Sequence, residues 1–290
     1  MSLLVSKKIA AANKKQFIKQ CNNLVAEVCN NADEIDVLLV GFSGKNYFYE
    51  QLYSALSFIK NVGRPKEWLI VDDGTYSEEQ KTTLQEIPGL RVIDYDLPGV
   101  SGFKGFKDLA GTHIWGRIFY TYFNIIDQMA RTTIFLEADV LVFEGINRYT
   151  HLFKKGNYYL ADTDSHFDSH YLKEKGRPMI DVNNGFVIYN TRPPLEIPYQ
   201  YMMNRLRDGN FEYFSPQSAF QLMIENDPHA LFFDPRYFVV NCSDHFKVGI
   251  DHSPGERINH IFPGRMAIRH FVGPVRHKMW QTPWQQVLRK

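Results

Sequence analysis

The chain has 290 residues and a formal net charge of +1, and 44% of its residues are hydrophobic and 22% charged. These values predict a soluble globular protein of one large domain and exclude a broad basic surface for nonspecific nucleic-acid binding. Its three cysteines are not at metal-ligand spacing, so we expect free thiols in a reducing compartment.

Helix and strand patterns alternate along the first half of the chain. Residues 7–31 carry apolar residues at helical spacing and predict an amphipathic helix. After it we expect, in chain order, a strand at 36–44, a helix at 47–63, a strand-to-helix junction at 67–80, a strand at 90–97, a helix at 112–131 and a strand at 133–143. Such alternation is typical of an α/β protein with a mostly parallel central sheet flanked by helices.

The pattern changes after residue 150. Strands are expected at 158–167 and 181–192 and a helix at 215–226. The C-terminal third is richer in His, Pro and aromatic residues and has a weaker periodicity. We therefore expect a less regular half packed on the first.

No clear linker separates these parts, so the chain is expected to form a single domain, 1–290, with an N-terminal helix in 1–35 and halves at about 36–150 and 151–284. No apolar stretch reaches the length of about 18 residues that spans a membrane. The start of the chain does not have the pattern of a signal peptide. We expect a cytoplasmic location, and the sequence leaves a peripheral membrane contact open.

The most informative feature is a pair of acids inside the apolar run TIFLEADVLVF at 133–143. Side chains at i and i+2 of a strand point to the same side, so Glu137 and Asp139 are expected to face one way. Two unpaired carboxylates in apolar surroundings are costly and need a proton, a basic partner or a divalent metal. Oxygen ligands suit Mg²⁺ or Mn²⁺, and such an ion suggests a phosphate-bearing substrate. Asp162 and Asp164 form a rival pair, but their polar surroundings tolerate acids without an ion.

The segment VDDG at 71–74 lies at the end of the second predicted strand, where open parallel sheets bind their ligands. Asp72 or Asp73 is a candidate contact to the base or ribose of a nucleotide. The alternative is an ordinary Asp-Gly turn before a helix that Ser77 caps.

Two later segments are also rich in polar groups. In DVNNGFVIYN, at 181–190, Asn183 and its neighbour are candidates to bind a sugar, and the alternative is an Asn-Gly hairpin turn. IRHFVGPVRHKMW, at 268–280, gathers His270, Arg276 and Lys278 around Gly273. A metal takes a neutral imidazole and a diphosphate takes Arg or Lys, whereas the alternative is a solvated basic segment.

Taken in order, these pieces resemble a nucleotide-sugar glycosyltransferase with the GT-A fold, and most of all glycosyltransferase family 8, which includes glycogenin and lipopolysaccharide galactosyltransferases. The resemblance covers roughly 36–284. Its motifs are WGRIF with Arg117, LEADVLVF with Glu137 and Asp139, VNNGFVIYN with Asn183 and Gly185, and HFVGPVRHKMW from His270. Three departures stand out: Glu137 replaces an Asp, Arg276 stands where Lys is expected, and Pro216-Gln217 replaces an Asp-Gln pair.

The resemblance implies a metal-dependent transfer of a hexose from a UDP-sugar with retention of anomeric configuration. Residue by residue, the resemblance implies that Glu137, Asp139 and His270 bind Mn²⁺ or Mg²⁺. It implies that the diphosphate lies near Gly273 and contacts Arg276 or Lys278, and that the uridine lies near Asp72 or Asp73. It also implies that Arg117 positions the donor and that Asn183 and Gln217 line the sugar and acceptor pocket. The first half would bind the nucleotide and the second the acceptor, which remains open among carbohydrate, lipid-linked and protein acceptors. The oligomeric state is open, and we expect no nucleic-acid partner.

Two other functions remain open at this point. The segment VDDGTYS also resembles the start of a large inverting GT-A family, which would need a catalytic base such as Asp162, Asp164 or Asp244. The altered motifs are also compatible with a degenerate protein that binds a nucleotide or glycan without transferring sugar.

Overall fold

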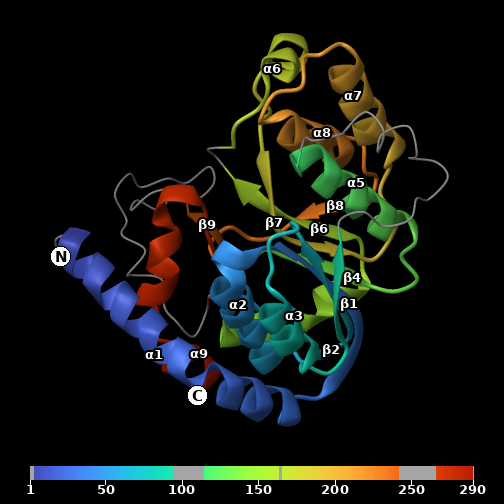
Figure 1. Cartoon of the computed structure of the whole chain (residues 1–290). Helices are drawn as coiled ribbons and strands as arrows, with labels where there is room; N and C mark the ends of the chain where they lie inside the picture. Colours follow the sequence, from blue (N-terminus) through green and yellow to red (C-terminus); the bar gives the residue numbers. More distant parts are fainter. Residues whose placement is uncertain (1–2, 95–113, 163–164, 242–265, 290) are drawn as a thin grey trace.

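In the computed structural model, the described residues are 3–94, 114–162, 165–241 and 266–289. Their main feature is a seven-stranded sheet in the order β3-β2-β1-β4-β7-β6-β8 (Figure 1). In chain order these strands are β1 (Glu34–Ser43), β2 (Arg64–Asp72), β3 (Leu90–Asp94), β4 (Thr133–Leu136), β6 (Asn157–Asp162), β7 (Asp181–Tyr189) and β8 (Ala230–Phe232). All neighbouring pairs are parallel except those of β7, which runs antiparallel to β4 and β6. The predicted mostly parallel α/β sheet is therefore confirmed.

Helices cover both faces of this sheet. The α-helices are α1 (Leu3–Asn30), α2 (Phe48–Asn61), α3 (Glu78–Gln85), α5 (Ile114–Asp127), α6 (Ser169–Lys175), α7 (Glu196–Arg207), α8 (Ser215–Glu225) and α9 (Trp284–Leu288), and the 3₁₀ segments are η1 (Lys45–Tyr47), η3 (Glu144–Lys154) and η5 (Gly273–Gln281). Along β1, Leu39 packs in the core with α1 and α2, whereas Leu38 and Val40 pack in the core with α5, α7 and α8. This alternation follows from the two-residue period of a strand buried on both faces.

The expected single strand over 133–143 is wrong. Strand β4 ends at Leu136, a turn follows, and the chain continues in β5 (Val140–Val142). β5 belongs to a second sheet, of order β5-β10-β9, with β9 (Phe238–Asn241) and β10 (Ile268–Phe271). The Val140 N–H closes the turn on the carbonyl of Glu137, at 3.2 Å. The acid pair thus lies in a turn at the carboxyl end of β4.

A wide bulge in β7 replaces the Asn-Gly hairpin turn that the sequence allowed. Pairing with β6 jumps from Val187 opposite Tyr159 to Asn183 opposite Leu160. The bulged residues lie inside the strand, and the Gly185 carbonyl accepts a hydrogen bond from the Glu137 N–H at 2.9 Å. The acid-bearing turn is therefore hydrogen-bonded to the irregular part of β7.

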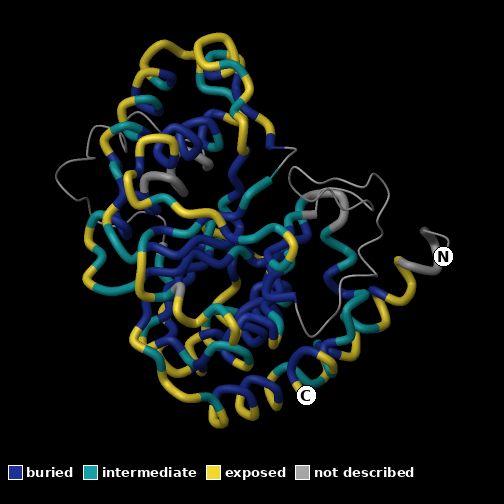
Figure 2. Tube along the Cα trace, turned by 180° about the vertical axis from the view of Figure 1, so that it is seen from behind, coloured by how far each residue is buried: buried dark blue, intermediate teal, exposed yellow. Residues whose placement is uncertain are grey.

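The long helix α1 packs against the C-terminal part of the chain. Phe17 lies 5.3 Å from the ring of Trp280 and 5.4 Å from that of Tyr53, and Asn13 donates a hydrogen bond to the Trp280 carbonyl at 2.8 Å. Seen from behind, α1 alternates between buried and exposed residues, whereas the strands of the sheet are buried (Figure 2). Its Cys21 is a free thiol, as is Cys29. None of the helices in the described ranges is long and apolar enough to cross a membrane.

Candidate metal and nucleotide site

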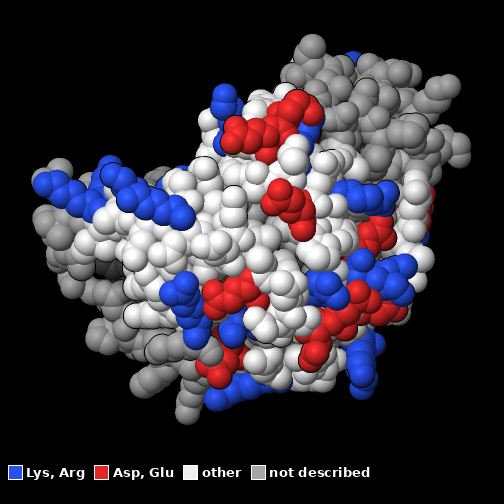
Figure 3. All heavy atoms as spheres, turned by 60° about the horizontal axis from the view of Figure 1, so that its bottom comes forward, with Lys and Arg blue, Asp and Glu red and all other residues white. Residues whose placement is uncertain are grey.

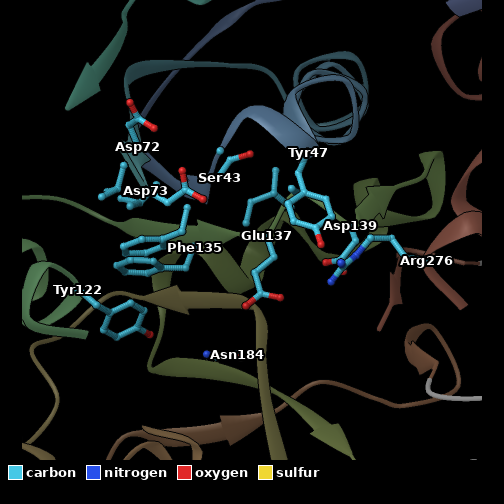
Figure 4. Close-up of a pocket in the computed structure, with 16 residues that line it drawn as sticks. Ser43, Tyr47, Asp72, Asp73, Tyr122, Phe135, Glu137, Asp139, Asn184 and Arg276 are labelled. Atoms are coloured by element: carbon cyan, nitrogen blue, oxygen red, sulfur yellow. The ribbon is translucent and has the colours of Figure 1, made fainter. Parts of the chain in front are cut away.

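A cleft of about 250 Å³ opens at the carboxyl ends of β1, β2 and β4 (Figure 4). Open α/β sheets bind ligands at this edge. Asp72 and Asp73 lie at one end of the cleft, and Asp139 and Arg276 at the other. Its lining also includes Tyr122, Phe135 and residues of β1 and β2. Its lining is therefore apolar with carboxylates at both ends.

The structure brings Glu137, Asp139 and His270 together. The His270 Nε2 lies 3.0 Å from an Asp139 carboxylate oxygen and 3.1 Å from one of Glu137. One ligand atom from each of the three lies within 4.8 Å of the others. The pairing of β10 with β5 causes this approach, because it sets His270 opposite Val140, next to Asp139. Residues 131 positions apart thus form one cluster.

A row of polar residues on α2 holds the acid-bearing turn, and the sequence reasoning missed it. The Ser54 hydroxyl donates to the Glu137 carbonyl at 2.9 Å, and Ser57 Oγ accepts from the Val142 N–H at 2.9 Å. Asn61 donates to the Val142 carbonyl at 3.0 Å. The only signal in the sequence was polar residues at helical spacing inside an otherwise apolar helix, which also fits an ordinary helix surface.

Asn183 fixes which nitrogen of His270 carries a proton. Its Oδ1 accepts the Gly185 N–H at 2.8 Å, so this atom is the amide oxygen. The same oxygen lies 2.8 Å from His270 Nδ1, which must therefore be the donor. In the neutral imidazole, Nε2 then carries the lone pair and faces the carboxylates of Glu137 and Asp139. Only a proton or a cation among these three groups makes that arrangement stable.

Gly185 allows the imidazole to approach this closely. A Cβ atom built on it would lie 2.2 Å from the Nδ1 of His270, far inside van der Waals contact. His270 is almost fully buried and lies against the bulge of β7. The glycine of the NNG segment therefore leaves room for the His270 imidazole and does not form a hairpin turn.

Two cationic side chains balance the two acids. The Arg276 Nε donates to Asp139 Oδ2 at 2.6 Å, while His270 faces Oδ1. Burial lowers the pKa of His270, but the carboxylates of Asp139 and Glu137 outweigh it and raise the pKa to about 10. Burial raises the pKa of Asp139, and His270 and Arg276 together lower it below its usual value. Both oxygens of Asp139 are thus engaged by protonated groups.

The donor set fits a divalent metal. Two carboxylates and one imidazole, with a hydrogen bond from the second ring nitrogen to an amide oxygen, match the ligands and the supporting contacts of Mn²⁺ or Mg²⁺ sites. A bound ion would take the place of the His270 Nε2 proton. Arg276 would then be released from Asp139 Oδ2 to face an anionic ligand.

At the other end of the cleft, Asp72 makes its hydrogen bonds within its own turn. Its Oδ1 accepts the N–H groups of Gly74, Thr75 and Tyr76 at 2.9, 3.1 and 3.2 Å, and the carboxylate is only 1% exposed. Lys81 lies 3.3 Å from its other oxygen. The predicted capping of α3 by Ser77 is confirmed, with Gln80 completing a capping box. VDDG is therefore a structured turn, and Asp73 is its more accessible carboxylate.

Tyr47 is a cleft residue that the sequence did not identify. It follows β1 in η1, it is 41% exposed, and the Arg276 guanidinium lies 4.5 Å from its ring centre. An exposed tyrosine at the mouth of an apolar cleft is a suitable surface for a planar base. In the sequence, this role of Tyr47 was indicated only by an aromatic residue that follows the first predicted strand.

The remaining candidates are more dispersed. Gln217 donates to the Val182 carbonyl at 2.6 Å, and Asp162 binds the Ser165 hydroxyl at 3.0 Å and the Asn183 amide at 3.5 Å. Gly273 is the first residue of η5. Lys278 also lies on η5 but does not line the cleft, and burial lowers its pKa. Arg117 is in α5, but its side chain is outside the described residues, as are Asp164 and Asp244.

A comparison with solved structures found several that are similar to this chain. The galactosyltransferase LgtC, in complex with donor and acceptor sugar analogs, is similar with a TM-score of 0.52 and 14% identity over 82% of this chain and 87% of that chain. The bifunctional glycosyltransferase WbbM gives a TM-score of 0.49 and 12% identity, with 88% and 50% of the two chains covered. Core-mannan synthase A from Aspergillus fumigatus, in an Mn/GDP form, gives 0.41 and 12%, with 90% and 89% covered.

No protein-family model matches the sequence, and no curated protein matches it. The likeness to LgtC shows the fold: a GT-A glycosyltransferase fold, similar to that of family 8. The resemblance read from the sequence motifs is confirmed at this level.

Proposed function

We propose that this chain is a metal-dependent glycosyltransferase that moves a hexose from a UDP-sugar to an acceptor with retention of configuration. The observation that carries the proposal is the cluster of Glu137, Asp139 and His270 at the ligand-binding edge of the sheet. A mixed carboxylate and imidazole cluster beside a cleft is the arrangement expected for a metal that binds a diphosphate. The GT-A fold supports the same conclusion.

The cleft has one end for the nucleoside and one for the diphosphate. Asp73 would accept hydrogen bonds from the ribose or the base, while Asp72 holds the turn that presents it. The exposed ring of Tyr47 offers a stacking surface once Arg276 moves off it. A uridine nucleotide would then lie between the carboxyl ends of β1 and β2, with its phosphates toward Asp139.

Glu137, Asp139 and His270 would hold the metal. When bound, the ion supplies Lewis-acid stabilisation of the negative charge on the departing diphosphate, which is commonly worth several kcal/mol. Arg276 would add a positive charge on the same side, because its guanidinium lies at this end of the cleft. Ser54 and Ser57 would keep the turn, and with it the two carboxylates, in place.

On the sugar side, the structure favours a different residue from the one that the motif suggests. Both ends of the Asn183 amide are used inside the protein, on Gly185, His270 and Asp162. Asn184 lines the cleft instead and is the better candidate to contact the hexose. Gln217 remains a candidate for the acceptor side. Retention of the anomeric configuration is what the resemblance to family 8 implies.

The test is to incubate the protein and Mn²⁺ with a panel of UDP-, GDP- and CDP-sugars and simple glycoside acceptors, and to follow release of the nucleoside diphosphate. We expect release from a UDP-hexose that requires the metal and Asp139. NMR of the product then decides the anomeric outcome, and an inverted product would move the function to the inverting alternative. No metal-dependent release from any donor in the panel would contradict the proposal.

A second function is favoured by one observation. His270 and Arg276 already occupy both oxygens of Asp139, so the cluster is electrically balanced without a metal. A protein that binds a nucleotide or glycan without transferring sugar could use this charge-balanced cluster without a metal. Tight UDP binding that is unchanged by EDTA, with no release of UDP from donors, would favour this second function.

A further inference from the structure

The outward side of α1 carries several exposed lysines. Between Leu3 and Ala26 the helix has five lysines and no acidic residue. Lys14 is bound to Glu50, but the other four, here called the α1 lysines, are exposed and form no ion pair with any residue that the structure describes: Lys7, Lys8, Lys15 and Lys19. Among the described residues, no carboxylate therefore neutralises the charge of the α1 lysines.

Three of these lysines form a row opposite the buried side. At 3.6 residues per turn, Lys8, Lys15 and Lys19 lie within about 40° of each other around the helix axis. Phe17 and Leu24, which are fully buried, lie on the opposite side. The row extends over roughly 16 Å at 1.5 Å per residue. Packing of α1 against the protein thus turns the row toward the surroundings.

Elsewhere on the described surface in Figure 3, charges of the two signs are mixed. The net charge of the chain is only +1, and an exposed lysine such as Lys66 lies 3.6 Å from Asp36. Figure 3 shows positive and negative side chains interspersed over most of this face, whereas positive ones stand without negative ones toward the end where α1 begins. The field of the α1 lysines is therefore local and of one sign.

Apolar residues accompany the lysines on the same helix. The helix starts with the sequence Leu3-Leu4-Val5, and Ile9 is 40% exposed. Exposed lysines beside an exposed isoleucine, on a helix whose sequence starts with apolar residues, are typical of segments that lie on a membrane surface. A nucleic acid or an acidic protein would give no reason for the apolar residues.

We propose that the α1 lysines dock this protein on the surface of an anionic lipid bilayer. The inference is independent of the proposed sugar transfer. A lysine near an anionic leaflet strengthens binding by about fivefold, so a row of three contributes roughly a hundredfold. The contact is electrostatic, so it should weaken as salt shortens the range of the field.

The test is co-sedimentation of the full chain with phosphatidylcholine vesicles that contain or lack phosphatidylglycerol. We expect binding only to the anionic vesicles, and loss of binding in high salt. The triple variant Lys8→Gln, Lys15→Gln, Lys19→Gln should bind roughly a hundredfold more weakly. The matched control Lys60→Gln, Lys155→Gln, Lys173→Gln removes the same charge from exposed lysines elsewhere and should bind like the wild type.

Circular dichroism should show the same helix content in all three proteins, because Gln is a good helix former. Failure of the folded wild type to bind anionic vesicles in low salt would overturn the proposal. So would an equal loss in the control triple. Binding to soluble heparin as tight as that to vesicles would also overturn it, because the partner would then be any polyanion and not a bilayer.

Discussion

Replacing Asn183 with alanine removes the group that orients the candidate ligand His270. Its Oδ1 accepts two buried donors, the Gly185 N–H and His270 Nδ1, each at 2.8 Å. Without this oxygen the imidazole loses its preference for the tautomer that presents Nε2 to Glu137 and Asp139. Loss of such an outer contact typically lowers metal affinity by about 10- to 100-fold, which corresponds to about 1.4–2.7 kcal/mol.

The same change leaves two buried donors without an acceptor, so the free energy of unfolding should also fall by about 1–3 kcal/mol. Titration of Mn²⁺ into the folded variant by calorimetry separates the two effects. Asn184→Ala, the next residue of the bulge, is the matched control and should keep the wild-type Mn²⁺ affinity. A folded Asn183→Ala variant with unchanged Mn²⁺ affinity would contradict this role of Asn183.

Three further predictions follow from the same contacts. Asp139→Asn should abolish Mn²⁺-dependent UDP binding. It should also lower the free energy of unfolding, because Arg276 loses its carboxylate partner and the buried His270 keeps only Glu137. Asp162→Asn should spare UDP binding, and calorimetry of both variants checks this. Gly185→Ala should disrupt the cluster, because the new Cβ would lie 2.2 Å from the His270 ring; unchanged thermal stability and Mn²⁺ affinity would contradict this. Asp72→Ala should lower stability by about 1–3 kcal/mol by releasing three N–H groups, whereas Asp73→Ala should mainly weaken UDP binding, as chemical denaturation and UDP titration would show.

The sequence predicted the sheet and most of its helices because their patterns are local. The run of 36–44 and the helix of 47–63 have buried strand and amphipathic helix patterns that depend on nearby residues only. The continuous strand over 133–143 failed because its end is set by distant partners. Pairing with β7 stops at Leu136, and β10 recruits Val140–Val142 into another sheet.

The candidate site was predictable in its residue types but not in its contacts. An acid pair and a late histidine indicated a metal, and the fold does bring Glu137, Asp139 and His270 together. The roles of Asn183 and Arg276 depend on which neighbours their side chains reach. Asn183 lies 87 positions from His270, and Arg276 lies 137 from Asp139. Such separations leave no periodic signal in a single sequence.

We propose that Glu137, Asp139 and His270 hold a metal that binds the diphosphate of a uridine nucleotide. Calorimetric titration of UDP into the wild-type protein, once with Mn²⁺ and once with EDTA, tests it most directly. We expect tight UDP binding with Mn²⁺, and the affinity should fall at least tenfold, or by about 1.4 kcal/mol, when EDTA removes the metal. Equal UDP affinity under both conditions, or no UDP binding under either, would contradict it.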